Sequence, residues 1–263
     1  MITFNSLGNL GRLANQMFQY ASLKGIAKNR GFDFVIPPKD NFGKTDPLVR
    51  KESLNIHNTF NLDTEIGMYP NELCAERMHT FDQELFDKCP DNVSLHGFFQ
   101  SWRYFDNVKD QIREDFTFHD DILEPCKEMI ASVDEPIMLH VRRGDPNLTD
   151  PRGFKWAYTQ CSSQHPPQPL EYYEKALRAF PEDQPVIVFS DSVDWVKEQE
   201  LFKPDRFMIS EPVDKYDDGS FTPYADLCLM SLCSHAIIAN SSCLLYTSPS
   251  PRDRTRSRMP SSA

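Results

Sequence analysis

Short apolar runs alternate with amphipathic stretches along the second half of the chain. The runs predict buried strands, and the spacing of apolar residues between them predicts helices. The strands are expected at 137–141, 185–189, 207–209 and 235–239, and the helices at 169–180, 193–201 and 224–233. Nearly continuous apolar runs are typical of parallel strands buried on both faces. The alternation therefore predicts a parallel α/β sheet.

The N-terminal part of the chain predicts a second α/β unit. Apolar residues continue at helical spacing from Leu13 to about Arg30, where Gly31 is the expected stop. Further strands are expected at 32–36 and 93–98, a helix at 105–116, and connecting segments with one or two short strands within 40–91. Two such units would leave a cleft between them. Ligands of open α/β sheets bind beyond the carboxyl ends of the strands.

Composition and length fit such a globular protein. The chain has 263 residues, of which 40% are hydrophobic and 25% charged. No apolar run reaches the roughly 18 residues that a membrane-spanning helix needs. The N-terminus lacks the basic segment and apolar core of a secretory signal. We therefore expect a cytoplasmic protein with no transmembrane segment.

The charge of the chain restricts its partners. A formal net charge of −11 argues against broad nucleic-acid binding, which needs a positive surface. A phosphate ligand would need a local cluster of arginines on this acidic background. The seven cysteines are irregularly spaced, which favours buried thiols over a zinc site.

The segment from His140 to Asp145 has the strongest chemical pattern. It places Arg142 and Arg143 at the end of a buried strand, where packing gives no reason for two arginines. A guanidinium offers a planar fork of donors that grips phosphate oxygens in pairs. An Arg–Asp salt bridge at a strand end explains the motif equally well when it is taken alone.

Polar residues also follow two other predicted strands. Asp191 is suited to the N–H groups of a base or to ribose hydroxyls, while Ser192 is explained as a helix cap. Asn240, Ser241 and Ser242 would place hydroxyls and backbone N–H groups where a phosphate can rest. For each segment by itself, a cap or a polar turn is the better explanation.

Asn15 and Gln16 lie near the start of the first predicted helix. They are placed either to hydrogen-bond a ligand or to cap the helix. The glycine spacing before them does not match a dinucleotide-binding fingerprint.

The order of these segments along the chain resembles the α-1,2-fucosyltransferases of glycosyltransferase family eleven. The resemblance extends from about Asn5 to Ser242, with Ala14 in place of a family glycine. The matching segments are Ala14–Ala21, Gly97–Phe105, His140–Asp145, Phe189–Trp195 and Asp226–Ser242.

This resemblance implies a GT-B-like fold, with two Rossmann-type halves facing a cleft. It implies inverting transfer of L-fucose from GDP-β-L-fucose to a galactoside hydroxyl in α-1,2 linkage, with a glycan as acceptor and with no metal or other cofactor. Donor binding then falls to the C-terminal half, and the N-terminal half shapes the acceptor site.

The resemblance also implies roles for the residues. Arg143, assisted by Arg142, would stabilise the negative charge of the leaving GDP. Asp191 would contact the nucleoside, and Asn240, Ser241 and Ser242 the diphosphate; Asn15 and Gln16 are further substrate-binding candidates. Asp145 and His140 are both candidates for the base that takes the acceptor proton.

The resemblance stops at residue 243. From Cys243 to Asp253 the sequence equals one reading frame of a widely used transposase sequencing adapter. We hypothesise that 243–263 is non-native, disordered read-through and that the C-terminal half is incomplete. We therefore expect the truncated chain to be poorly stable and at best weakly active. The expected regions are 1–133 on the acceptor side, 134–242 on the donor side, and this tail. Recovering the same tail from the source locus by resequencing would contradict the hypothesis.

Two other functions fit part of the pattern. A non-catalytic fragment that binds a GDP-sugar would keep the arginines but lack a competent active site. A generic phosphate-binding enzyme such as a phosphatase explains the arginines but not the ordered motifs, and the sequence offers it no nucleophile.

Overall fold

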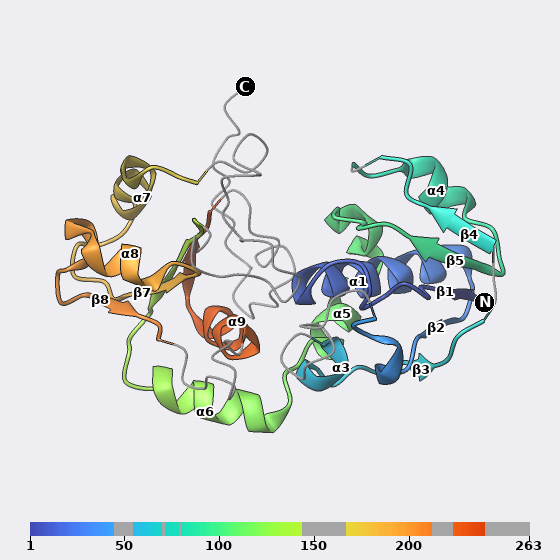
Figure 1. The fold of residues 1–263 in the computed structure, drawn as a ribbon, viewed down its shortest axis with the longest axis horizontal. Helices are drawn as coiled ribbons and strands as arrows, with labels where there is room; N and C mark the ends of the chain where they lie inside the picture. The colour runs from blue at the N-terminus through green and yellow to red at the C-terminus, as the bar shows by residue number, and fades with distance from the viewer. Residues whose placement is uncertain (45–54, 70–71, 79, 144–166, 212–222, 240–263) are drawn as a thin grey trace.

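The protein consists of two α/β halves, each with its own parallel sheet (Figure 1). The structure is a computed structural model and describes residues 1–44, 55–69, 72–78, 80–143, 167–211 and 223–239. The first half is drawn on the right in Figure 1 and the second on the left. The prediction of two parallel α/β units is confirmed.

The first half contains a five-stranded sheet with the order β3-β2-β1-β5-β4, in which all neighbouring strands are parallel. Its strands are β1 (Ile2–Thr3), β2 (Phe34–Ile36), β3 (Glu65–Ile66), β4 (Glu72–Ala75) and β5 (Val93–His96). Its helices are α1 (Leu13–Arg30), α3 (Ile56–Thr59), α4 (Gln83–Lys88) and α5 (Lys109–Asp115), with 3₁₀ turns at Lys39–Asn41, Trp102–Tyr104 and Asp106–Val108.

The second half contains a four-stranded sheet with the order β8-β7-β6-β9, again with all neighbours parallel. Its strands are β6 (Ile137–Val141), β7 (Val186–Ser190), β8 (Phe207–Ile209) and β9 (His235–Ile237). Its helices are α6 (Asp120–Ile130), α7 (Leu170–Leu177), α8 (Val193–Glu198) and α9 (Pro223–Leu232), with a 3₁₀ turn at Glu200–Phe202.

Helix α1 packs at the centre of the first half, and most of its side chains are buried. It ends at Gly31 in the left-handed conformation, with φ +69°, so the predicted stop is confirmed. Gly25 lies where α1 meets the chain after β5. A Cβ atom there would lie 2.0 Å from the Tyr104 carbonyl oxygen, so only glycine allows this close approach.

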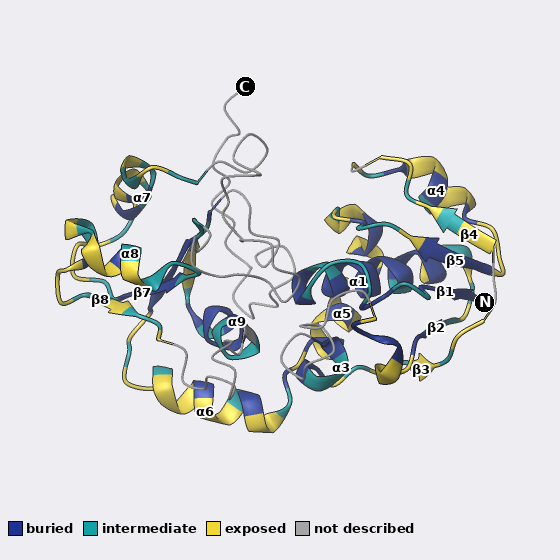
Figure 2. Ribbon diagram, viewed as in Figure 1, coloured by how far each residue is buried: buried dark blue, intermediate teal, exposed yellow. Residues whose placement is uncertain are grey.

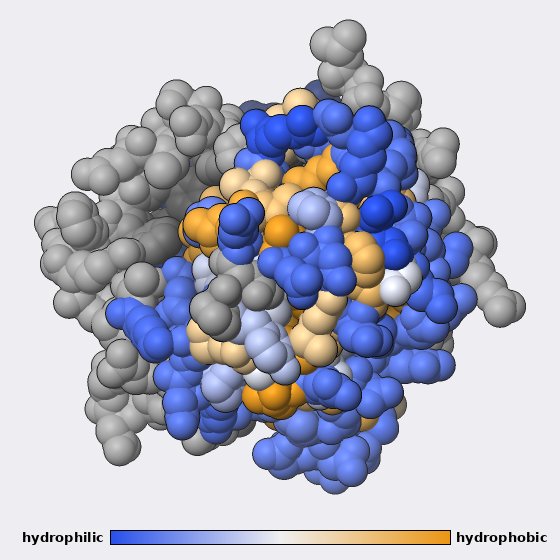
Figure 3. All heavy atoms as spheres, turned by 90° about the vertical axis from the view of Figure 1, so that its right-hand side faces the viewer, coloured by the Kyte–Doolittle hydropathy of each residue, from blue (hydrophilic) through white to orange (hydrophobic). Residues whose placement is uncertain are grey.

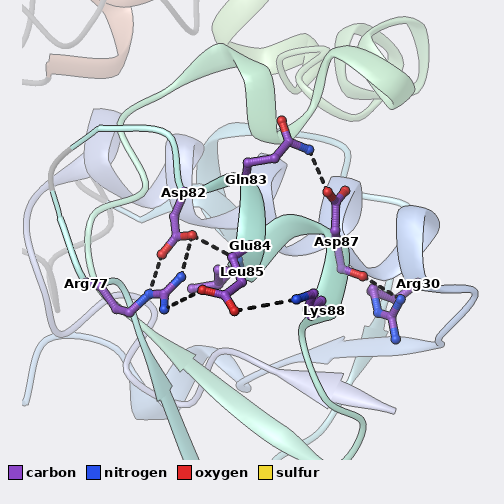
Figure 4. A network of polar contacts seen from close by, with 8 residues as sticks. All are labelled: Arg30, Arg77, Asp82, Gln83, Glu84, Leu85, Asp87 and Lys88. Atoms are coloured by element: carbon purple, nitrogen blue, oxygen red, sulfur yellow. Dashed lines mark hydrogen bonds and ion pairs between the residues drawn. The ribbon is translucent and has the colours of Figure 1, made fainter.

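Arg77, which follows β4, connects this strand to α4 (Figure 4). Its Nε and Nη2 donate to the two carboxylate oxygens of Asp82 at 2.6 and 2.7 Å, and its Nη1 donates to Glu84 at 2.9 Å. Asp82 also caps α4 by accepting the Leu85 N–H at 2.9 Å. These bonds, with Arg77 first, hold the pKa of Asp82 down at about 2. The Asp82 N–H donates to the Tyr104 hydroxyl at 2.8 Å, which fixes α4 to the chain after β5.

Strands β6 and β7 are buried on both faces of the second sheet, as their apolar runs predict. Ile137, Leu139 and Val141 belong to the core shared with α7 and α8. Met138 and Phe189 belong instead to the core that contains the α9 residues. Side chains alternate across a strand, so each face has its own helix cover.

Helix α6 connects the two halves and packs against α9. Just before it, residues 117–119 are bonded to the first half: Asn61 N–H donates to the Thr117 carbonyl at 2.8 Å, and His119 N–H to the Thr59 carbonyl at 3.2 Å. These hydrogen bonds with the first half therefore end at His119, and α6, which packs against α9 of the second half, begins at the next residue. The predicted boundary at 133/134 stays a prediction, although α6 precedes it and packs with the second half.

Three helices are absent from the sequence prediction. Helix α6 has Pro125 inside it, a residue that disfavours a helix interior, although its apolar residues recur at helical spacing. Helices α3 and α4 lie within 40–91, where we expected only short strands, and β3 and β4 are those strands. The helix expected at 105–116 is divided into a 3₁₀ turn and α5.

Burial follows the sheets (Figure 2). The strands and inner sides of α1 and α9 are buried, whereas the outer sides of α4, α6 and α8 are exposed. The side of the first half that faces away from the second half shows apolar surface among hydrophilic residues (Figure 3). Leu73 and Ile66 of this half are 69% and 53% exposed. This surface lies on the opposite side from the residues considered next.

Candidate functional site

The predicted phosphate-binding arginines lie at the carboxyl edge of the second sheet. The order β8-β7-β6-β9 puts the topological switch point between β6 and β9, where ligands of such sheets bind. Arg142 and Arg143 follow β6 directly, and Asp191 follows β7. Because the strands are parallel, these residues meet at one edge, which we call the arginine edge.

Arg143 is held at the arginine edge by two contacts. Its backbone N–H donates to Asp191 Oδ1 at 2.9 Å, which joins the chain after β6 to the chain after β7. Its guanidinium carbon lies 3.9 Å from the centre of the Trp195 ring, in cation–π geometry. Arg142, Arg143 and Asp191 are all partly exposed. The arrangement presents an oriented cation to solvent at the strand end.

Two tyrosines of α7 support this edge. Tyr173 is fully buried, and burial raises the pKa of its hydroxyl to about 12, against a smaller opposing effect of Arg143. It therefore stays neutral beneath the arginines. The Tyr172 hydroxyl donates to the Ile238 carbonyl at 2.6 Å, which ties α7 to the end of β9.

His140 lies within β6, and its side chain is only 5% exposed. Burial, and then the charge of Arg142, lower its pKa to about 3. Its Nδ1 has no hydrogen-bond partner within the part of the chain that the structure describes. A buried group with this pKa is a weak proton acceptor near neutral pH. The geometry therefore disfavours His140 as the base for the acceptor proton.

The other predicted residues of this half lie outside the described residues. These are Asp145, Asn240, Ser241 and Ser242, together with the tail 243–263. Their predicted roles stay predictions.

Asn15 and Gln16 differ in their surroundings. Gln16 is fully buried, and its Oε1 accepts the Ile56 N–H at 3.2 Å, so it joins α1 to α3. Asn15 is partly exposed, and its Oδ1 accepts a hydrogen bond from Gln100 Nε2 at 2.7 Å. The alternative that either residue caps α1 is wrong, because the N-cap is Arg12 without a side-chain cap.

The Asn15–Gln100 pair lies at the carboxyl edge of the first sheet. The order β3-β2-β1-β5-β4 puts the switch point of this sheet between β1 and β5. Gln100 belongs to the chain after β5, and Asn15 to the start of α1 after β1. We call this the amide edge. Figure 1 shows that α1 begins on the side of the first half that faces the second half.

The chain matches the sequence pattern of one protein family over nearly its whole length. The pattern described as Glycosyl transferase family 11 matches residues 2–248. The chain belongs to this family.

Curated relatives of this family 11 chain are glycosyltransferases. An α-1,2-colitosyltransferase of Escherichia coli is 28% identical over 88% of the chain and 82% of its own length. Human galactoside α-(1,2)-fucosyltransferase 1 is 27% identical over 87% of the chain, which spans 60% of the human protein. The expectation of a glycosyltransferase of the α-1,2-fucosyltransferase type is confirmed.

Solved structures show the same fold. The fucosyltransferase NodZ from Bradyrhizobium superposes with a TM-score of 0.58 at 16% identity and covers 94% of this family 11 chain and 89% of its own. POFUT1 gives a TM-score of 0.51 at 14% identity, over 96% of this chain and 94% of its own. The GT-B-like arrangement of two halves is therefore confirmed.

Sequence reasoning missed several residues of this family 11 site. Tyr172 and Tyr173 were assigned only to an amphipathic helix, and Gln100 only to a family motif. The expected cap by the Ser192 side chain is wrong: Ser192 is the N-cap of α8, but its side chain makes no cap bond, and its N–H donates to Ser190 Oγ at 2.9 Å. A polar residue after a predicted strand indicates that it lies at the sheet edge, but it does not indicate which residue it will bond to.

Ser210 and Asp226 form a further polar contact in the second half. Ser210 follows β8 and donates from its Oγ to Asp226 Oδ1 at 2.8 Å. Burial raises the pKa of Asp226. Within the described residues no group of three or more histidine, cysteine or acidic side chains is placed to hold a metal ion, and no helix is both long and apolar enough to cross a membrane.

Proposed function

We propose that this chain transfers L-fucose from GDP-β-L-fucose to a galactoside hydroxyl in α-1,2 linkage, with inversion and without a metal. Family membership supports the reaction class. The α-1,2 relatives support the linkage. A NodZ structure described as soaked with GDP-fucose supports the donor class for this fold.

The observation that carries the proposal is the orientation of Arg143. Its backbone is fixed by Asp191, and its guanidinium is stacked on Trp195, at the end of β6, the strand that borders the switch point of the second sheet. A guanidinium keeps its charge at all physiological pH values and matches phosphate oxygens in pairs. Arg142 adds a second cation at the same strand end.

The chemical step places negative charge beside these cations. The bond from fucose C1 to the β-phosphate oxygen breaks, and its electron pair goes to GDP. The acceptor oxygen forms the new bond to C1 from the opposite face, and its proton passes to water. A cation held in place before the reaction stabilises the charge that develops on the leaving GDP. A loose transition state of this kind needs little help from a base, which agrees with the weak basicity of His140.

The test measures GDP release and fucoside formation with β-galactoside acceptors, in EDTA, for the full chain and for Arg143→Ala. Arg178→Ala, at an exposed position after α7, is the matched control. We expect weak fucoside formation by the unmodified chain and by the control, and none by Arg143→Ala. Because one relative is named for colitosyl transfer, a colitose donor is assayed in parallel.

The outcomes separate the proposal from its alternative. GDP binding without turnover of either donor would favour a non-catalytic binding fragment. Turnover that EDTA abolishes would contradict metal independence. Equal activity of Arg143→Ala and the unmodified chain would remove the role proposed for this arginine.

A further inference from the structure

The loop from Gly97 to Ser101 has an unusual backbone. Phe99 has φ +51°, a left-handed conformation that a bulky residue rarely adopts, and Gly97 has φ +147°. Such backbone costs roughly 1–3 kcal/mol and persists only where the surroundings fix it. Phe99 is fully buried, with its ring centre 5.7 Å from that of Phe4 and 5.2 Å from that of Tyr104.

Glu76 fixes this loop through its carboxylate. Its Oε2 accepts the N–H groups of Phe98 at 2.9 Å and Phe99 at 3.1 Å, although 22 or more residues separate them in sequence. Glu76 follows β4, and its own N–H donates to the His96 carbonyl at 2.8 Å. Hydrogen bonds to a carboxylate are about twice as strong as those between neutral groups.

Gln19 of α1 fixes the loop from the other side. Its Nε2 donates to the Gly97 carbonyl at 3.0 Å and to the Leu10 carbonyl at 2.9 Å. One side chain therefore holds the loop after β5 and the loop after β1 at a fixed separation. Ser22 adds a bond from its Oγ to the Phe99 carbonyl at 3.3 Å.

The fixed loop presents Gln100. This side chain is exposed, and its Nε2 bonds Asn15 Oδ1 at 2.7 Å across the switch point of the first sheet. A side-chain amide carries two N–H donors and an acceptor oxygen, the groups that pair with sugar hydroxyls. A neutral amide pair offers a phosphate much less than a guanidinium does.

We propose that Gln100 and Asn15 bind hydroxyls of the acceptor sugar, and that Glu76 is the positioning residue that holds Gln100 in place. This inference rests on the proposed function, since a transfer between two substrates needs a second site besides the arginine edge. The amide edge has the chemistry for a neutral polyol. It lies on the side of the first half that faces the second (Figure 1).

The first experiment measures binding of methyl β-galactoside to the full chain by ligand-observed NMR, without donor. The variants are Gln100→Ala and Asn15→Ala, with Gln111→Ala as the matched control because Gln111 is an exposed glutamine on α5. We expect about tenfold weaker galactoside binding for each variant, as for one or two lost hydrogen bonds, and no change for the control. GDP binding is expected to be unchanged in all three.

The second experiment tests Glu76 by its coupling to Gln100. Glu76→Ala alone should weaken galactoside binding several-fold, and Glu76→Gln, which keeps one acceptor oxygen, should weaken it less. Adding Glu76→Ala to Gln100→Ala should produce little further loss, because the presented side chain is already gone. A purely structural role would give additive losses and would weaken GDP binding as well.

These readouts separate the inference from the proposed function. If galactoside binding depends on Gln100 but no fucose is transferred, the acceptor site stands and the proposed reaction fails. If transfer occurs and galactoside binds the Gln100 and Asn15 variants as tightly as the unmodified chain, the inference is overturned. Absence of galactoside binding to the unmodified chain overturns it too.

Discussion

The two sheet edges of this protein share an architecture and differ in chemistry. Beside each switch point a carboxylate that follows the adjacent strand accepts backbone N–H groups beyond a strand end: Asp191, after β7, for Arg143, and Glu76, after β4, for Phe98 and Phe99. The arginine edge thereby presents fixed cations, and the amide edge presents a neutral pair. The same means of fixing a loop occurs at both edges, so the edges differ in the side chains that they present.

The substitution Arg143→Gln would remove this difference most directly, because it replaces a fixed cation at the arginine edge with a neutral amide. We expect kcat/KM for the GDP-sugar to fall by about 10²–10³-fold, as on loss of a main electrostatic donor. Arg143→Lys should retain part of the activity, since it keeps the charge but loses the planar fork. Steady-state kinetics with varied donor measure both. Unchanged donor kinetics in Arg143→Gln would show that charge does not distinguish the edges.

Asp191→Ala tests whether the carboxylate contact is what prepares the arginine. Without an acceptor for its N–H, the chain after β6 loses its link to β7, and we expect a fall of about 10–100-fold in kcat/KM for the donor. Asp191→Asn keeps an acceptor oxygen and should lose less. Galactoside binding at the other edge is the internal control and should not change. Equal losses in Asp191→Ala and Asp191→Asn would instead indicate that the charge of Asp191 matters.

Asp82→Ala tests the support of the amide edge. The variant loses the cap of α4 and the bonds to Arg77, and we expect about 1–3 kcal/mol of lost stability by denaturant unfolding. In the unmodified chain the pKa of Asp82 is about 2, below its usual value near 3.9. This stabilisation is therefore complete above about pH 4 and is lost as the pH falls from about 4 to 2. An acid-unfolding curve that Asp82→Asn leaves unshifted would contradict the assignment.

His140 makes the stability of the protein depend on pH in a range above that of Asp82. Its pKa of about 3 lies below the unfolded value near 6.5, so the unfolded chain takes up its proton first. Stability from the neutral imidazole is complete above about pH 6.5 and is lost as the pH falls toward 3, with a slope of at most about 1.4 kcal/mol per pH unit. His140→Gln should remove this part of the slope between pH 6.5 and 4. Transfer rates that follow a group titrating near 6.5 and vanish in His140→Gln would make His140 the base after all.

Much of the arginine edge was predictable from sequence, because its signal is local. The buried apolar run predicts the strand, which is confirmed as β6, and its end places Arg142 and Arg143 at the sheet edge, while their role toward phosphate stays a prediction. The contacts that orient Arg143 were not predictable: Asp191 was expected to contact a nucleoside, and in the structure it accepts the Arg143 N–H. This contact depends on how β6 and β7 pair, and the local sequence of either strand does not determine that pairing.

The amide edge was less predictable for the same reason. Asn15 and Gln16 are adjacent on a helix and point in directions about 100° apart, so only packing decides which is exposed. Glu76 reaches Phe98 and Phe99 because β4 pairs with β5. The sequence pattern of residues 40–91 does not indicate which strand β4 pairs with. Helix α6 was not predicted because Pro125, a residue that disfavours a helix interior, lies within it.

The connection between the halves determines how the two edges can approach each other. Residues 117–119 are bonded to the first half, and α6 begins at residue 120 and packs against α9. No free length of chain therefore separates the two bodies along this connection. A change in the distance between the two edges would need rotation about the backbone torsions near His119, or else the separation of α6 from α9. An angle at one joint, and not the length of a linker, would therefore set that distance.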